Sequence, residues 1–314
     1  MNGIDTFIQQ TINGLVLGSI YALIALGYTM VYGILGIINF AHGDVLMVGA
    51  MVALTVLKLL GTYAPALPPA LALGVAMLAA MAVCAVLSAA IERFAYRPLR
   101  RAPKLAPLIT AIGVSMIVQT LAMLIWSRNP MSFPQLLPSQ PLPVAGTGAV
   151  VSAKELVIVA LAIGVMALLE LLVERTKLGR AMRATAENLR VAALMGIDPD
   201  RVIRLTFMLG GALAAVAGVM LATNYGNAHF YMGFIPGLKA FTAAVLGGIG
   251  NLRGAMLGGI LLGLIEQYGA GYIGDLTGGV FGSNYQDVFA FVVLIAVLLL
   301  RPSGLLGERV ADRA

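Results

Sequence analysis

The polar residues most able to do chemistry lie in a short segment between two long apolar runs. Asn39, Phe40, His42 and Asp44 fall within residues 36–44, which read GIINFAHGD. An ionised Asp at the centre of a membrane-spanning helix costs about 2.5–3.5 kcal/mol on insertion scales, so such residues usually face a bundle interior or an aqueous path. We expect these four side chains to line or gate a translocation path. The alternative is an interfacial loop in which they are solvated and Asp44 caps the following helix.

Several kinds of catalytic and metal chemistry are not expected from this sequence. The two histidines, His42 and His229, are too far apart for a metal-ligand pair, and Cys84 is the single cysteine. The chain has no H-E-x-x-H, G-x-S-x-G or G-x4-G-K-(S/T) motif. We therefore expect no metal, no cofactor, no catalytic centre and no ATP hydrolysis by this chain. The basic residues fall in a few short loops, which predicts membrane topology and no nucleic-acid partner.

Composition predicts an all-α polytopic membrane protein. Of the 314 residues, 60% are hydrophobic and only 11% are charged, with a mean hydropathy of +0.95. A soluble domain carries about 25% charged residues. The 37 glycines are consistent with helices that approach one another closely in lipid.

About 20 apolar residues cross the core of a bilayer, and nine segments of the chain are candidates. Three of them, 45–60, 238–250 and 286–300, are short, which predicts discontinuous or re-entrant helices. We expect eight or nine transmembrane helices in a single domain, residues 1–314. The nine segments are 12–33, 45–60, 67–91, 105–127, 154–173, 205–225, 238–250, 255–270 and 286–300.

Three clusters of basic residues predict which loops are cytoplasmic, and they hold 15 of the 20 Lys and Arg residues. The intervening loop Arg128–Lys154 contains five prolines and is expected to be extended and outside. Residues 1–57 carry no Lys or Arg, so the side of the N-terminus stays open. The clusters are Arg93, Arg97, Arg100, Arg101 and Lys104; Arg175, Lys177, Arg180, Arg183, Arg190, Arg201 and Arg204; and Arg301, Arg309 and Arg313.

Two segments resemble each other and predict a weak internal repeat. Gly36-Ile-Ile-Asn39-Phe40 and Gly248-Ile-Gly-Asn251-Leu252 each follow one apolar span and lead into another. Transporters built from internal repeats place the substrate path at broken helices in matching positions. We therefore add Gly248, Gly250 and Asn251 to the candidate path.

A row of glycines predicts a close contact between helices. Gly250, Gly254 and Gly258 are spaced four residues apart and would share one helical face. This packing is compatible with a helix break in the same segment.

The segment Glu174–Arg204 is a polar island that carries seven basic residues. Leu189, Ala192, Ala193 and Gly196 fall on one narrow face of a short helix, which suits contact with another protein. The alternative is an ordinary loop that only sets topology.

The same island predicts where the short helix ends and the next begins. Gly196 suits the left-handed conformation that ends a helix. Asp198 is placed to cap the following helix, and Pro199 occupies its first position, where a missing N–H costs nothing. The short helix is expected over Thr185–Met195.

These segments resemble one transporter family over about residues 10–305. The stretch Arg183-Ala-Thr-Ala-Glu-Asn188, with Ala192 and Gly196, is similar to the coupling-helix region of ATP-binding-cassette importer permeases, especially those for branched-chain amino acids and related amides and urea. Arg190 and Val191 depart from the wider E-A-A-x3-G pattern of such importers. Further similar stretches are Asn13–Leu15, Ser19–Gly27, Gly36–Asp44 and Ala240–Gly254.

The resemblance implies a permease domain over residues 1–314, in a multi-pass protein of the bacterial inner membrane. It implies a pore that alternates access for branched-chain or other neutral amino acids. Expected partners are a second, homologous permease, two cytoplasmic ATPases that use ATP and Mg²⁺, and a periplasmic binding protein. Loop 128–154 is then periplasmic, while loop 174–204 and the C-terminus are cytoplasmic. The residues expected to dock the ATPases are Glu187, Asn188, Leu189, Ala192, Ala193 and Gly196.

Two alternative functions are considered: a permease for urea or short amides, and a secondary transporter driven by an ion gradient. The second would need a carboxylate buried within a span. We place none there from sequence: Lys239 is expected to extend to an interface, and Glu266 to lie near a loop.

Overall fold

The computed structural model describes residues 3–100, 102–103, 105–144, 146–278, 285–301 and 303–307. It is built of helices wherever the sequence predicts an apolar span. Four of the basic residues named above, Arg101, Lys104, Arg309 and Arg313, lie outside the described residues. The helices are α1 Gly3–Leu35, α2 His42–Tyr63, α3 Pro69–Ile91, α4 Leu105–Ile125, α5 Ala153–Arg175, α6 Lys177–Glu187, α7 Leu189–Leu194, α8 Pro199–Tyr225, α9 Phe234–Gly247, α10 Leu252–Leu276 and α11 Gln286–Leu300.

Among the described residues, six helices are long and apolar enough to cross a membrane: α1, α2, α3 with the turns that follow it, α4, α5 and α8. The chain is therefore an all-α, multi-pass membrane protein, and the exact number of crossings stays a prediction. The segment 45–60 was expected to be short, but α2 has 22 residues because it begins at His42. Helices α9 and α11 are short, with 14 and 15 residues.

The helices divide into two compact units, each assembled from separate stretches of the chain. Unit 1 takes its described residues from Met1–Thr29, Pro138–Gly164 and Lys239–Ala314. Unit 2 consists of Met30–Leu137 and Val165–Leu238.

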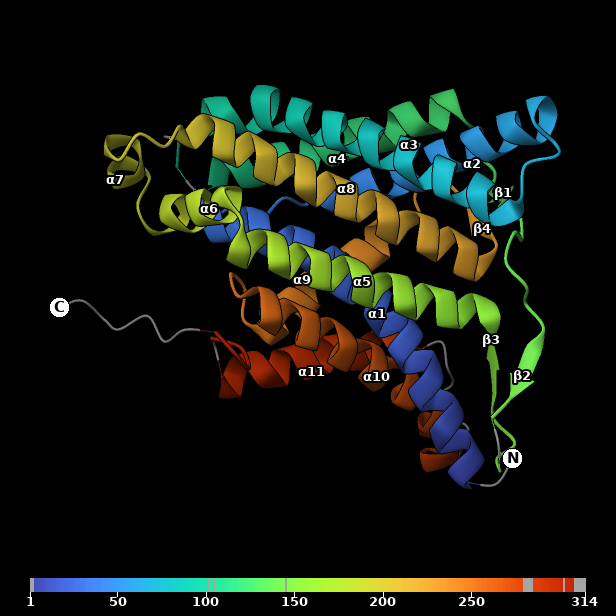
Figure 1. Cartoon of the computed structure of the whole chain (residues 1–314). Coiled ribbons are helices and arrows are strands. Elements are labelled where there is room, and N and C mark those ends of the chain that lie inside the picture. Colours follow the sequence, from blue (N-terminus) through green and yellow to red (C-terminus); the bar gives the residue numbers. More distant parts are fainter. Residues whose placement is uncertain are drawn as a thin grey trace. The chain divides into compact units, whose positions relative to one another are not determined.

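Helices α2, α3 and α8 pack against one another at the centre of unit 2 (Figure 1). Glycines permit this packing: a Cβ added to Gly49 would lie 2.6 Å from the Ala215 Cα, and Gly218 faces the Leu46 carbonyl. Such close backbone approach stabilises helix contacts in lipid. Cys84 is buried in this core, where its thiol donates to the Val45 carbonyl over 3.3 Å. It is a small buried residue in a packed helix interface.

In unit 1, α10 packs through glycines on two sides. A Cβ added to Gly18 would lie 2.8 Å from the Ile260 Cα, which shows how closely α1 approaches α10. Gly254 and Gly258 face α9, as the glycine row predicts. Gly250 does not belong to that row, because it precedes α10 in a turn with φ of +99° and has open space around it.

The loop expected to be extended contains three short strands: β1 Met131–Ser132, β2 Pro141–Pro143 and β3 Val150–Ser152. Strands β2 and β3 form an antiparallel hairpin in unit 1. In unit 2, β1 pairs with β4, Asn227–Ala228, which follows α8. Two turns of other helix type extend α3: the π-helix η1, Glu92–Tyr96, and the 3-10 turn η2, Arg97–Leu99.

Candidate functional site

The connection between α1 and α2 is a buried break in unit 2. Gly36, with φ of +62°, follows the last residue of α1. Asn39, His42 and Asp44 are all buried, and Phe40 is half-buried, so a solvated loop is excluded. Asp44 is not the cap of α2, because the helix begins two residues earlier and its capping position, Ala41, makes no side-chain bond.

Two polar side chains of this break, Asn39 and Asp44, are bonded to other elements of unit 2. The Tyr96 hydroxyl donates to Asn39 Oδ1 over 3.0 Å. Gln119 of α4 donates to Asp44 Oδ1 over 2.8 Å. Burying such groups is costly unless they are hydrogen-bonded, so these contacts hold the break in place. Whether these residues line the translocation path stays a prediction.

The matching break in unit 1 lies between α9 and α10. Gly248 and Gly250 have φ of +105° and +99°, which explains why glycine occurs at both positions. Asn251 caps α10 by accepting from the Gly254 N–H over 3.0 Å, and its amide donates to the Leu306 carbonyl over 2.9 Å. In both breaks a glycine with positive φ, Gly36 or Gly248, follows a helix. The asparagines have different roles, because Asn251 caps a helix and Asn39 does not.

A buried ion cluster in unit 1 was not predicted. Lys239 of α9 pairs with Glu266 of α10 over 2.7 Å and with Asp287 of α11 over 2.6 Å. Tyr21 of α1 donates to Glu266 over 3.1 Å. Lys239 is 4% exposed and Glu266 is 1% exposed, so Lys239 does not extend to an interface and Glu266 is not near solvent. The sequence does show two opposite charges, Lys239 and Glu266, in two apolar segments. Their separation along the chain does not reveal that they are in contact.

The polar island Glu174–Arg204 contains two short helices, α6 and α7. Asn188 has extended backbone angles, ends α6 and caps α7 by accepting from the N–H groups of Arg190 and Val191. Glu187 therefore lies at the end of one helix and Leu189 at the start of the next. This differs from the single short helix expected across Thr185–Met195.

The exposed side of α7 differs from the predicted face. Ala192 is 2% exposed and packs within the chain, so it cannot contact a partner directly. Leu189, Ala193 and Gly196 are exposed as predicted. The largest exposed apolar side chains are ones that the prediction missed, Leu194 at 86% and Met195 at 78% exposed, with Val191 beside them.

The turn from α7 to α8 follows the predicted capping signals. Gly196 has φ of +82° and ends the α7 segment. Asp198 caps α8 by accepting from the Arg201 N–H over 3.2 Å, and Pro199 is the first helical residue. These three local expectations are confirmed.

Two of the predicted basic clusters meet at one end of unit 2. Arg97 and Arg100, which follow α3, both bond to Asp200 in the first turn of α8. Arg100 also bonds to the buried Glu92, and Arg204 lies 3.8 Å from the same carboxylate. The loops after α3 and before α8 therefore lie on the same side of the unit.

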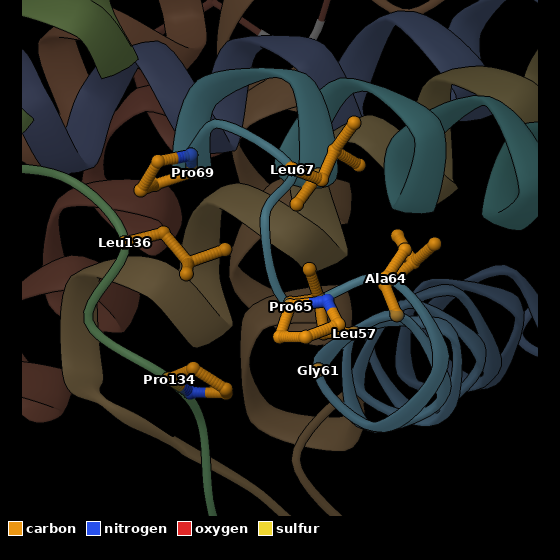
Figure 2. Close-up of a pocket in the computed structure, with 10 residues that line it drawn as sticks. Leu57, Gly61, Ala64, Pro65, Leu67, Pro69, Pro134 and Leu136 are labelled. Carbon is orange, nitrogen blue, oxygen red and sulfur yellow. The ribbon is translucent and has the colours of Figure 1, made fainter.

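An apolar cavity of about 300 Å³ lies at the C-terminal end of α2 (Figure 2). It is formed by the end of α2, the turn into α3 and the loop after β1. None of its lining residues is charged, so it offers apolar contact and no catalytic group. The lining residues are Leu57, Leu60, Gly61, Ala64, Pro65, Leu67, Pro69, Ala72, Pro134 and Leu136.

Comparison with known proteins gives consistent matches along the chain. The family model described as branched-chain amino acid transport system / permease component matches residues 10–298. The chain is 47% identical to the high-affinity branched-chain amino acid transport system permease protein BraD of Pseudomonas aeruginosa, over 96% of both chains. It is 43% identical to the corresponding permease LivH of Escherichia coli K12, again over 96% of both. A probable branched-chain amino acid permease of Methanocaldococcus jannaschii is 29% identical over 93% of this chain and 90% of the relative.

Proposed function

Because this chain belongs to the family of permease components of branched-chain amino acid transport systems, we propose that it is the transmembrane pore subunit of an ATP-driven importer of branched-chain amino acids. The observation that carries the proposal is the match to BraD, which extends over 96% of both chains. The relatives are transport permeases and not enzymes.

The proposed importer requires other subunits to supply energy and substrate. We propose two cytoplasmic ATPases that use ATP and Mg²⁺, a second homologous permease and a periplasmic binding protein. This chain itself is proposed to bind no cofactor. The absence of a G-x4-G-K-(S/T) phosphate loop supports the assignment of ATP hydrolysis to a partner.

The proposed ATPase contact is the exposed side of α7. Leu194 and Met195 present apolar side chains on a segment that is rich in basic residues. We place this segment outside the membrane, so contact with lipid does not account for their exposure. Apolar side chains at the centre of an interface with charged residues at the rim are typical of protein partners. Asn188 and Gly196, at the two ends of α7, would set the direction of the helix.

The proposed orientation has the N-terminus in the periplasm and the basic loops in the cytoplasm. Asp5 and Gln9, at the start of α1, accept from the backbone N–H groups of Gly148 and Val150 in the Pro-rich loop, each over 2.9 Å. Just beyond the other end of α1, Asn39 bonds to Tyr96 beside the first basic cluster. Because basic loops mark the cytoplasmic side, these contacts support one crossing by α1 and a periplasmic N-terminus.

An ion-driven transporter is the second candidate, because the structure contains buried carboxylates, Asp44 in unit 2 and Glu266 in unit 1. Glu266 is paired with Lys239, however, and a carboxylate held by an ammonium is poorly placed to carry a proton or sodium ion. The family match to permease components of branched-chain amino acid transport systems favours the ATP-driven importer.

Reconstitution distinguishes the two candidates. Proteoliposomes containing this chain, its homologous permease and the two ATPases, supplied with the binding protein, should import leucine only when ATP is enclosed on the ATPase side. Leucine uptake by this chain alone under a proton or sodium gradient would refute the proposal.

A further inference from the structure

Tyr96 contacts both the α1–α2 connection and α8. Its side chain is buried at the last residue of the π-helix η1, and its hydroxyl donates to Asn39 Oδ1 over 3.0 Å. The carbonyl of Asn39 in turn accepts from the N–H of His42, the first residue of α2, over 3.0 Å. The Tyr96 ring packs against Phe207 of α8, with ring centroids 5.5 Å apart. One residue thus fixes the buried break to its neighbours.

The residues on both sides of Tyr96 fix η1 to the first turn of α8. Arg97 and Arg100 follow it and bond to the same carboxylate, Asp200. Glu92, the first residue of η1, is buried and accepts from Arg100. A π-helical turn is rare and is frequently found at functional sites.

The first turn of α8 is also directly connected to α7. Four residues, Met195–Asp198, separate the two helices, and Asp198 caps α8 two positions before Asp200. The turn between α7 and Asp200 is therefore short and capped. From Asp200, bonded contacts continue through Arg97 and Arg100 to η1 and Tyr96.

We propose that Tyr96 is a positioning residue for transport, which transmits movement of the α7–α8 turn to the connection between α1 and α2. The inference rests on the proposed function, because it requires ATPases that move α7. The hydroxyl of Tyr96 is the group that makes the connection. A change that removes it breaks the bond to Asn39 and leaves the packing against Phe207 in place.

The test compares Tyr96→Phe with wild type in the complete transporter, reconstituted with its permease partner, ATPases and binding protein. We expect the number of leucine molecules imported per ATP hydrolysed to fall about fivefold, at the lower end of coupling between distant sites. ATPase copurification and the rate of ATP hydrolysis should stay at the wild-type level. Tyr63→Phe is the matched control, because Tyr63 is 83% exposed at the end of α2, and it should leave the ratio unchanged.

A ratio for Tyr96→Phe equal to that of wild type overturns the proposal. If this variant fails to reach the membrane, Asp200→Asn decides, because it weakens the other end of the connection at a partly exposed side chain. It should also lower the ratio, and an unchanged ratio overturns the proposal. Failure of the wild-type chain to copurify with the ATPases would instead refute the proposed function, so the two failures are distinguishable.

Discussion

Lys239 Nζ lies 2.7 Å from Glu266 Oε1 within the apolar interior of unit 1. The ammonium of Lys239 joins α9 to α10 through Glu266, and Asp287 of α11 accepts its second contact. In lipid an unpaired ionised group is costly, so this pair accounts for how α9, with only 14 residues, can carry a lysine.

Replacing one partner of this ion pair should destabilise the protein more than replacing both. Lys239→Met leaves the carboxylate of Glu266 buried without its counter-charge, which should lower the free energy of unfolding by about 3–5 kcal/mol. Lys239→Met combined with Glu266→Gln should recover most of that loss, because Asp287 is partly exposed and can be hydrated. Thermal unfolding of the purified protein measures both effects.

Lys58→Met is the control for the loss of a lysine, because Lys58 is exposed at the end of α2. Its unfolding temperature should match that of wild type. Equal destabilisation by Lys239→Met alone and by the double variant would show that the unpaired carboxylate of Glu266 is not the cause of the loss.

Local signals in the sequence predicted the capped turn before α8 correctly. Gly196, Asp198 and Pro199 each act within a few residues of their own position, so their types are enough to place a helix end and a helix start. The apolar segments likewise predicted the helices, because the length needed to cross a bilayer is set by the membrane.

Contacts between distant residues could not be predicted. The bond of Tyr96 to Asn39 and the pair of Lys239 with Glu266 depend on how helices pack, and no periodic pattern encodes them. The same limit explains why Ala192 was wrongly expected to contact a partner. Its spacing put it on an apolar face, but only the packing of α7 shows that this position is covered by the chain itself.

Docking of ATPases on α7 should depend on Leu194 and not on the general charge of the loop. Leu194→Asp places a carboxylate where we propose an apolar contact, and it should reduce ATPase copurification at least about tenfold, as expected for an interface hot spot. The change should not affect insertion, because Leu194 is 86% exposed. Pull-down from detergent extracts measures the association.

Leu142→Asp is the matched control, because Leu142 is an exposed leucine in β2 of the Pro-rich loop. It should leave copurification of the ATPases unchanged. Normal copurification of Leu194→Asp would move the docking surface away from α7.

Two glycine substitutions should have opposite effects on stability. Gly218→Ala adds a Cβ that meets the Leu46 carbonyl of α2, so helices α2 and α8 must separate, at a cost of about 1–3 kcal/mol. Gly113→Ala in α4 meets no atom within 4 Å and should stabilise the helix by roughly 0.5–1 kcal/mol. Unfolding temperatures of the two variants compare them directly, and equal shifts would argue against the close α2–α8 contact.

Labelling with a membrane-impermeant maleimide tests the proposed orientation and the buried break together. The single native cysteine, Cys84, is buried and should give little background. Leu142→Cys in the Pro-rich loop should react from the periplasmic side, and Leu194→Cys should react only after the cytoplasmic side is opened.

Asn39→Cys should stay unreactive in the resting transporter, because Asn39 is buried and bonded to Tyr96. Reaction of Leu142→Cys and Leu194→Cys from the same side would exclude this topology, whereas reaction of Asn39→Cys during ATP-driven import alone would support its place on the path.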